Sequence, residues 1–274
     1  MKALPTPTTH YRRDLQQILT AREWSRLGAL VDKACAKARI YARRSPDLCG
    51  LATDASPAQK AFLVRLYEAE RVGLTAVKRR ILDGLDHHAQ AICQYCGLDI
   101  PETFDHYLSK ADVPELALYA RNLVPCCYRC NNIRGPAFDR ATNERRILHF
   151  FDDDLASFPM ALQATLTFDD AGDPSVSYTT LDVPHRLAPV FRRHIDALRL
   201  ADRFRIRALD RVSVLRSTFA GATLTVAALV SVLKAQKRAV EAARGPNNWE
   251  VALLTALLDS PQALAWLRAG RSRP

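Results

Sequence analysis

Two Cys-x-x-Cys pairs constrain this 274-residue chain more than any other feature of its sequence. Cys93 and Cys96 form the first pair, and thirty residues separate it from the second pair, Cys127 and Cys130. Each pair offers two adjacent thiolates, and four thiolates complete the tetrahedral shell that zinc prefers. Five of the seven cysteines lie between Cys93 and Cys130, and this clustering favours a metal site over a disulfide framework. We therefore expect a structural zinc site, because four thiolates leave no coordination position open.

Cys126 leaves the second pair ambiguous, since it could replace Cys127 as a ligand with a longer spacing to Cys130. The two-residue spacing favours Cys127. Buried free cysteines without a metal are the simpler alternative for all four. Cys35 and Cys49 lie outside the cluster and are expected to be ordinary helix and loop cysteines.

Helical periodicity dominates on both sides of the cysteine pairs. Apolar residues recur at near-helical spacing from 13 to 88, with an irregularity around Ala21 to Trp24 and a connection from Ser45 to Ser56. Ser56-Pro57 supplies an N-cap followed by proline at the first helical position. We place His87 and His88 at the end of a helix, near its negative dipole.

One segment of the C-terminal part has strand periodicity instead. Polar and apolar residues alternate from 162 to 180 on both sides of Asp-Ala-Gly-Asp-Pro, which predicts a β-hairpin, and helices follow Pro184. The fold class is therefore mainly α with a small α+β insert. Three regions are expected: a helical N-terminal region, 1–88, for nucleic-acid or partner docking; a core with the zinc site, 89–152; and a hairpin plus helical region, 153–274.

The net charge of +10 is compatible with a nucleic-acid partner but is weak evidence for one. Arginine supplies 31 of the 39 basic residues, a bias that a GC-rich coding sequence also produces. The surplus is uneven: +7 over residues 1–92, zero over 93–150 and +3 over 151–274. We therefore expect the N-terminal helices to hold a nucleic-acid backbone. With neither a signal peptide nor a membrane span apparent, we expect a cytoplasmic protein and no membrane partner.

An Asp-His pair between the two cysteine pairs carries the candidate chemistry. A carboxylate, a carboxamide oxygen and waters suit a hard cation such as Mg²⁺, and a neutral histidine nearby can deprotonate a water. Asp105 and His106 are adjacent, however, so in a strand they point to opposite faces unless the strand twists or another element wraps round. Taken alone, the pair fits a turn acid and a surface histidine better than a site.

The order of the surrounding motifs makes the pair more specific. From 93 to 152 the chain resembles the HNH family of ββα-metal endonucleases, of the bacterial type with a DHYLPK-like first strand. The segments that carry the resemblance are the two cysteine pairs, Asp105-His106-Tyr107-Leu108-Ser109-Lys110, Asn122-Leu123-Val124-Pro125, Cys130-Asn131-Asn132-Ile133-Arg134-Gly135 and His149-Phe150-Phe151-Asp152.

The resemblance implies a role for each matching residue. His106 matches the general base, and Asn122 matches the asparagine that braces the loop and orients this base. Asp105 and Asn131 match the ligands of one catalytic cation, Mg²⁺ or Mn²⁺, although the neighbouring Asn132 leaves the second ligand open. The phosphate-binding residues would be Arg134, at a position where lysine is usual, and Lys110. His149 lies in a family-like element, but its aromatic neighbours favour a core histidine.

The implied function is hydrolysis of DNA phosphodiester bonds to a 5′-phosphate and a 3′-hydroxyl, with RNA left open as a substrate. Look-alikes with helical flanks suggest a nuclease subunit of a restriction or antiviral phage-defence system, which could act with an ATPase. The alternative is a non-catalytic zinc-knuckle module that binds nucleic acid or serves assembly.

Overall fold

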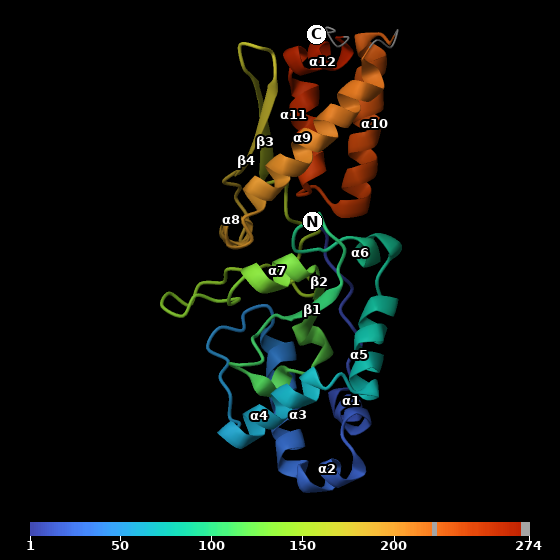
Figure 1. The fold of residues 1–274 in the computed structure, drawn as a ribbon. Coiled ribbons are helices and arrows are strands. Elements are labelled where there is room, and N and C mark those ends of the chain that lie inside the picture. Colours follow the sequence, from blue (N-terminus) through green and yellow to red (C-terminus); the bar gives the residue numbers. More distant parts are fainter. Residues whose placement is uncertain (221–223, 270–274) are drawn as a thin grey trace. The chain divides into compact units, whose positions relative to one another are not determined.

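A computed structural model describes residues 1–220 and 224–269, so residues 221–223 and 270–274 of the predicted C-terminal region lie outside it (Figure 1). The chain divides into two compact units, which we describe separately. The first unit is Ala3–Leu155, and the second comprises Met1–Lys2 and the chain from Ala156 onward. Residues 3–88 of the helical region expected at 1–88 and the core expected at 89–152 therefore lie within one compact unit.

Helices fill the N-terminal half of the first unit, as the periodicity predicts. They are α1 (Tyr11–Ile18), α2 (Ala21–Arg26), α3 (Gly28–Arg44), α4 (Pro57–Glu68), α5 (Val72–Asp83) and α6 (His87–Ala91). The irregularity near Ala21 is a break between α1 and α2, where the Thr20 side chain accepts a hydrogen bond from the Glu23 backbone N–H and caps α2. Ser56 caps α4 in the same way.

His87 and His88 were expected to end a helix and instead begin one. The Asp86 carboxylate accepts a hydrogen bond of 2.8 Å from the Ala89 backbone N–H, so Asp86 is the N-cap of α6. The expectation was wrong because the preceding helix, α5, already ends at Asp83. The aspartate before the two histidines was the signal for a new helix start.

The helices of the first unit pack closely around an apolar core. Helix α5 lies so near α1 that a Cβ added at Gly73 would meet the Gln17 carbonyl oxygen at 2.6 Å, so only glycine fits there. The short 3₁₀ helix η1 (Pro114–Leu116) packs on α3 and α4. Core side chains come from all of these elements: Leu15, Leu30, Val31, Leu63, Leu66, Leu74, Val77, Ile81 and Leu116.

Two short strands and a helix follow in the same unit. Strand β1 (Thr103–His106) pairs antiparallel with β2 (Leu123–Cys126), so that Thr103 faces Cys126 and His106 faces Leu123. The 3₁₀ helix η2 (Ala120–Asn122) precedes β2, and α7 (Tyr128–Ile133) begins directly after it and packs on β1. The order is therefore strand, strand, helix.

The second unit combines the predicted hairpin with helices (Figure 1). Strands β3 (Leu162–Phe168) and β4 (Pro174–Thr180) pair antiparallel over their whole length, which confirms the hairpin. The helices are α8 (Ala188–Ala197), α9 (Leu200–Phe219), α10 (Val226–Arg244), α11 (Trp249–Asp259) and α12 (Pro261–Arg268). β3 packs against α11 and β4 against α9. Over the described residues the fold is mostly helical with two small two-stranded sheets, as predicted, and none of its helices has the length and apolarity needed to cross a bilayer.

Candidate metal centre and adjacent pocket

Four cysteine thiols meet between the start of α7 and the segment that precedes β1. The ligand atoms of Cys93, Cys96, Cys127 and Cys130 all lie within 4.8 Å of one another, and all four side chains are buried. Cys127 is the N-cap of α7, where its thiol accepts a hydrogen bond from the Cys130 backbone N–H. The two Cys-x-x-Cys pairs therefore join a loop to the first turn of a helix.

The donor set fits zinc. Thiolates 2.3 Å from a tetrahedral ion lie roughly 3.8 Å apart, and the sulfurs of Cys96 and Cys127 are 3.9 Å apart. Hydrogen bonds from Cys130, Cys93 and Cys96 lower the pKa of the Cys127 thiol, because they stabilise its thiolate. A cluster that already favours one thiolate is suited to a cation with soft ligands.

Cys126 points away from the cluster. Its sulfur lies 3.5 Å from the Thr103 hydroxyl, and burial raises the pKa of its thiol to about 12. Of the two ligands that the sequence left open, the structure thus brings Cys127 to the other cysteines.

A cavity of about 490 Å³, here called the His106 pocket, collects most of the other expected residues. Asp105, His106, Lys110, Asn131 and Arg134 all line it, together with Asn132, Ser109, Asp112 and Arg140. Asp105 and His106 were expected on opposite faces of a strand, yet both border this one cavity. β1 ends at His106, and the chain leaves the strand there, so strict alternation does not hold at this position.

Only one of the two ring nitrogens of His106 forms a hydrogen bond within the described part of the chain. Its Nε2 lies 2.9 Å from the Ala117 carbonyl oxygen, and because a carbonyl only accepts, Nε2 carries the hydrogen. Nδ1 is then an acceptor, and no hydrogen bond to it is made within the described part of the chain. Burial lowers the pKa of His106 to about 4, so the ring is neutral at pH 7. The ring edge also packs on Tyr67, with centroids 4.3 Å apart. This histidine is therefore arranged as a proton acceptor.

Asp105 is held by two neighbours through one of its oxygens. Oδ2 accepts a hydrogen bond of 2.8 Å from the Tyr95 hydroxyl and forms an ion pair with the Arg134 guanidinium. Only 5% of the Asp105 residue is exposed. Within the described residues its Oδ1 has no bonded partner and is the oxygen left for a ligand.

Arg134 is buried rather than displayed on the surface. Its guanidinium also donates to the carbonyl oxygens of His106 and Tyr107, and 5% of the residue is exposed. It therefore ties the end of α7 to the end of β1. The structure places it as the internal counter-ion of Asp105, with Nη1 making no hydrogen bond.

Asn122 braces the loop that carries the histidine's partner. The side chain is fully buried, and its Oδ1 accepts from the Leu108 backbone N–H at 2.8 Å. Its Nδ2 donates to the carbonyl oxygens of Leu108 and Leu116. Leu116 precedes Ala117, whose carbonyl oxygen accepts the hydrogen bond from His106, so Asn122 supports the segment that orients the His106 ring.

Asn131 and Lys110 border the His106 pocket from different sides. Asn131 donates from Nδ2 to the Thr103 hydroxyl, which leaves its amide oxygen without a partner among the described residues. Lys110 forms an ion pair of 3.0 Å with Glu68 and lies over the Tyr67 ring. Asn132 is more exposed and donates to the Tyr128 carbonyl.

The donors in this pocket fit a hard divalent cation by their chemistry. Oδ1 of Asp105 and the amide oxygen of Asn131 are the oxygen ligands that Mg²⁺ and Mn²⁺ prefer. Arg134 already neutralises Asp105, so a cation there would compete with a guanidinium for the same carboxylate.

His149 lies outside the pocket and is a core histidine, as expected. It is fully buried, with Nε2 2.6 Å from the Tyr41 hydroxyl and Nδ1 3.3 Å from Asp152. Asp152 also pairs with Arg121. The His-Phe-Phe-Asp element thus links α3 to the end of the first unit.

Three contributors to the His106 pocket were not predicted from sequence. Tyr95 lies inside the first cysteine pair, and this position was a signal that it lies near the thiol cluster. Ala117 contributes its backbone carbonyl, and no side-chain pattern in the sequence identifies such a contact. The ion pair of Arg140 with Asp112, 2.9 Å long, falls in no motif.

The comparisons with known proteins agree with this geometry. The family model described as HNH endonuclease matches residues 93–136. No curated protein and no solved structure matches the chain. The matched segment contains the four clustered cysteines, both strands of the first sheet and α7. The part of the chain that carries the thiol cluster and the His106 pocket is therefore similar to HNH endonucleases.

Proposed function

We propose that this protein is a metal-dependent HNH endonuclease that hydrolyses phosphodiester bonds of DNA. One observation carries the proposal: in the segment that matches the family, His106, whose Nδ1 has no hydrogen-bond partner among the described residues, lines the same cavity as Asp105 and Asn131. A base and two oxygen ligands in one cavity are the parts that metal-assisted hydrolysis requires.

The chain's own residues supply the proton transfer and the positioning. His106 Nδ1 takes a proton from a water molecule, whose oxygen then forms a bond to phosphorus as the bond to the 3′ oxygen breaks. The departing 3′ oxygen is protonated from solvent, and His106 returns its proton to solvent, which leaves a 5′-phosphate and a 3′-hydroxyl. Asn122 and the Ala117 carbonyl keep the ring oriented.

Two metal ions belong to the proposal. Asp105 and Asn131 would hold Mg²⁺ or Mn²⁺, which would supply positive charge to stabilise the negative charge that develops during hydrolysis. The four clustered cysteines would hold zinc in a closed, structural site. Lys110 lies on the pocket's rim, 30% exposed, and is suited to contact a phosphate. Arg134 would act less directly, through Asp105.

The test is cleavage of plasmid DNA in Mg²⁺ or Mn²⁺ by three proteins. We expect His106→Ala to abolish cleavage while the variant stays folded with the zinc content of the wild type, because the ring is at the pocket and outside the thiol cluster. His88→Ala is the matched control, since His88 is exposed on α6, and it should cut normally. Undiminished cutting by His106→Ala would contradict the assigned base.

A non-catalytic zinc-knuckle module is the second candidate, and the ion pair of Arg134 with Asp105 favours it. A carboxylate already paired with a guanidinium is less available to a cation. DNA binding without cleavage in Mg²⁺ and in Mn²⁺ would support this module over the enzyme.

The cellular setting rests on the resemblance. We propose a cytoplasmic nuclease of restriction or phage defence, acting with a partner such as an ATPase, and the reduced state that a thiolate site needs supports this compartment. An ATPase or methyltransferase gene beside this one would support the role in defence. The same cleavage assay, run with RNA beside the plasmid, tests DNA against RNA as the substrate.

A further inference from the structure

A second cavity, here called the Tyr107 pocket, lies beside the His106 pocket. Its volume is about 250 Å³. The two cavities share four lining residues: Ser109, Asp112, Pro136 and Arg140. A molecule that occupies the His106 pocket therefore has an adjoining space into which a connected group can extend.

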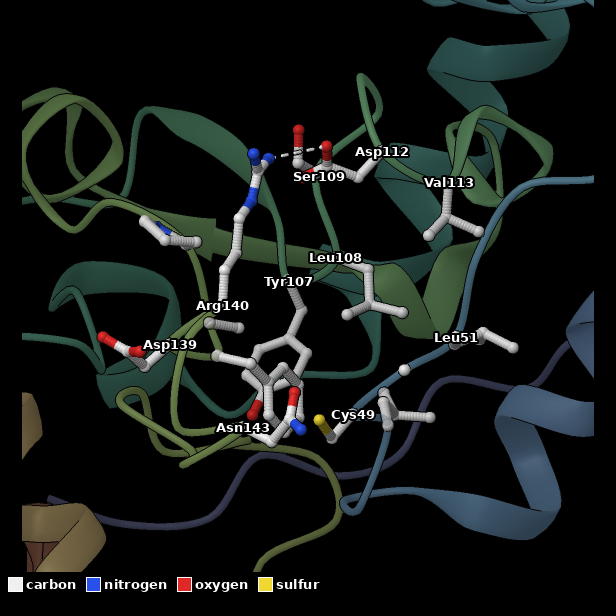
Figure 2. A pocket seen from close by; sticks show the side chains of 15 residues that line it. Cys49, Leu51, Tyr107, Leu108, Ser109, Asp112, Val113, Asp139, Arg140 and Asn143 are labelled. Carbon is white, nitrogen blue, oxygen red and sulfur yellow. Dashed lines mark hydrogen bonds and ion pairs between the residues drawn. The ribbon is translucent and has the colours of Figure 1, made fainter.

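The walls of the Tyr107 pocket are apolar and aromatic. Figure 2 shows Tyr107, Leu108 and Val113 around the cavity, with the Cys49 thiol directed toward it from the loop between α3 and α4. Phe138 adds a second ring, perpendicular to that of Tyr107 with centroids 6.2 Å apart. Flat, apolar groups pack well against such walls.

The rim of the Tyr107 pocket is polar. The Asn143 amide lies at its edge, is exposed and has no hydrogen-bond partner within the described part of the chain. Arg140 reaches along the rim to Asp112, and their side chains are 80% and 50% exposed. An ion pair this exposed is weak, so Arg140 can turn to another anion.

We propose that the Tyr107 pocket holds one nucleobase of the strand whose phosphate lies in the His106 pocket, taken out of the base stack. This inference rests on the proposed function. A phosphate and its base are joined by a single sugar, which matches two adjoining cavities that share a wall.

The size and the chemistry of the Tyr107 pocket favour a nucleobase over other small ligands. An apolar cavity of roughly 150 Å³ holds one benzene ring, so about 250 Å³ suits a heterocycle of one or two rings. Unstacked bases are held in this way by aromatic and apolar walls, with polar groups at their edges. The Asn143 amide offers both a donor and an acceptor to such an edge, and Arg140 can turn from its exposed ion pair with Asp112 to the connecting phosphate.

The experiment places 2-aminopurine, whose fluorescence rises when it leaves the stack, at each position around the cleavage site of a duplex. Binding is measured with full-length, zinc-loaded His106→Ala protein without added Mg²⁺ or Mn²⁺, so that no strand is cut. We expect a several-fold rise in fluorescence at one position next to the scissile phosphate and none elsewhere.

Two variants test whether the Tyr107 pocket causes that rise. Cys49→Phe fills the cavity and should abolish the fluorescence rise. Introduced into the otherwise wild-type chain, it should lower kcat/KM about tenfold, which is the order of effect that loss of one stacked base has. Asn143→Gly should change the preference among the four bases at that position, and glycine accepts the positive φ of 59° found there. Ile206→Phe adds the same ring on an exposed face of α9 and should change neither quantity.

The outcomes separate this inference from the proposed function. If the wild type cuts DNA while 2-aminopurine stays stacked at every position and both variants behave as wild type, the pocket inference is overturned and the function stands. If a base is unstacked on binding but nothing is cut, the function fails and the pocket inference stands. Should Cys49→Phe lose zinc or its folded state, Asn143→Gly decides: unchanged base preference counts against the pocket.

Discussion

Tyr95 connects the thiol cluster to the proposed cation site through a single hydrogen bond. It lies between Cys93 and Cys96, is fully buried, and donates to Oδ2 of Asp105 at 2.8 Å. Its ring packs on Phe150, with centroids 5.4 Å apart. A metal bound by the cysteines would therefore also fix the carboxylate that we propose as a ligand of the second metal.

We expect Tyr95→Phe to separate these two roles. The ring and its packing remain, so zinc content should stay at one ion per chain. The carboxylate loses a donor worth about 1.5–3 kcal/mol to a charged group, so the cleavage rate should fall between about tenfold and a hundredfold. Zinc analysis and cleavage kinetics at several Mn²⁺ concentrations measure both effects.

Tyr128→Phe is the matched control, because Tyr128 occupies the second cysteine pair but is 65% exposed. It should match the wild type in zinc content and in rate. Equal rates for Tyr95→Phe and Tyr128→Phe would show that the hydrogen bond to Asp105 does not matter for cleavage.

His149 gives the first unit a pH-dependent stability. Burial lowers its pKa from 6.5 to about 4, so between these values the unfolded chain binds one more proton at this residue than the folded chain. The free energy of unfolding should therefore be highest above pH 6.5 and fall as the pH falls toward 4, with a slope of about 1.4 kcal/mol per pH unit from this residue.

His149→Phe should remove that part of the slope. The substitution leaves Tyr41 bonded to the Arg121 carbonyl and leaves Asp152 paired with Arg121, so neither partner is orphaned. Urea unfolding at pH 4.5, 5.5 and 6.5 measures the slopes. If both proteins lose stability equally with falling pH, His149 is not the group responsible.

At this scale the sequence predicted which side chains lie close together better than what each of them contacts. His106, Asp105, Asn122 and Asn131 were identified from the order of motifs, and three of them line one pocket with Asn122 bonded behind it. Arg134 was expected to grip a phosphate, yet it is buried against Asp105. The motif shows where Arg134 lies in the sequence. Which group its guanidinium contacts depends instead on where α7 ends relative to β1, and the sequence does not show this.

Among the elements, α7 depends most on the cysteine cluster. It has six residues, and two of its anchoring thiols are at its N-cap and in its first turn. A helix this short gains little from its own hydrogen bonds. The metal would thus hold α7, with Asn131 and Arg134 on it, against β1.

Cys96→Ser should therefore destabilise the fold and not only impair cleavage. We expect loss of bound zinc and a fall in melting temperature of at least about 10 °C, which corresponds to roughly 3 to 5 kcal/mol in a unit of this size. Chelation of zinc from the wild type should have the same effect.

Cys126→Ser is the control, because Cys126 is equally buried but lies outside the cluster, near the Thr103 hydroxyl. It should keep its zinc. Pure wild-type protein that contains no zinc, or a Cys96→Ser variant as stable as the wild type, would contradict a structural metal.

Element prediction succeeded where the periodicity is long. The helix signalled by Ser56-Pro57 and the hairpin around 162–180 have seven or more residues in each element, enough to show a repeat. β1 and β2 have four residues each, and all of β2 is buried, so neither alternates visibly. Their existence followed from the motifs and not from any pattern of hydrophobicity.

Across the whole molecule, the surplus of positive charge lies on residues 1–92 and not on the segment that holds the His106 pocket. Deleting the first helices would be a poor test of this charge surplus, because it would also remove part of the core of the first unit. Leu15 and Tyr41 belong to the buried core of the first unit, and Tyr41 bonds His149. Sequence composition could locate the charge, but only the packing shows which basic side chains are free to meet a ligand.

Substitution of exposed arginines tests whether the surplus of positive charge on residues 1–92 binds DNA, and it leaves the core of the first unit intact. Arg13, Arg39 and Arg43 are exposed on α1 and α3, and changing all three to Gln should weaken DNA binding. If each contacts a phosphate, the slope of log affinity against log salt concentration should fall by about three.

The same triple change in the second unit, at Arg186, Arg205 and Arg238, alters the net charge equally. It should affect DNA affinity less. Equal losses for both triple variants would mean that net charge alone, and not a surface on the N-terminal helices, attracts DNA.

The central claim is that His106 and its neighbours hydrolyse a phosphodiester bond. The direct measurement is single-turnover cleavage of end-labelled DNA in Mn²⁺, with zinc-loaded wild type and His106→Ala side by side and the ends of the product identified. We predict 5′-phosphate and 3′-hydroxyl ends from the wild type, and no product from His106→Ala or from either zinc-loaded protein when Mn²⁺ is left out. Cleavage by His106→Ala at the wild-type rate, or an inactive wild type that binds both metals and DNA, would contradict the claim.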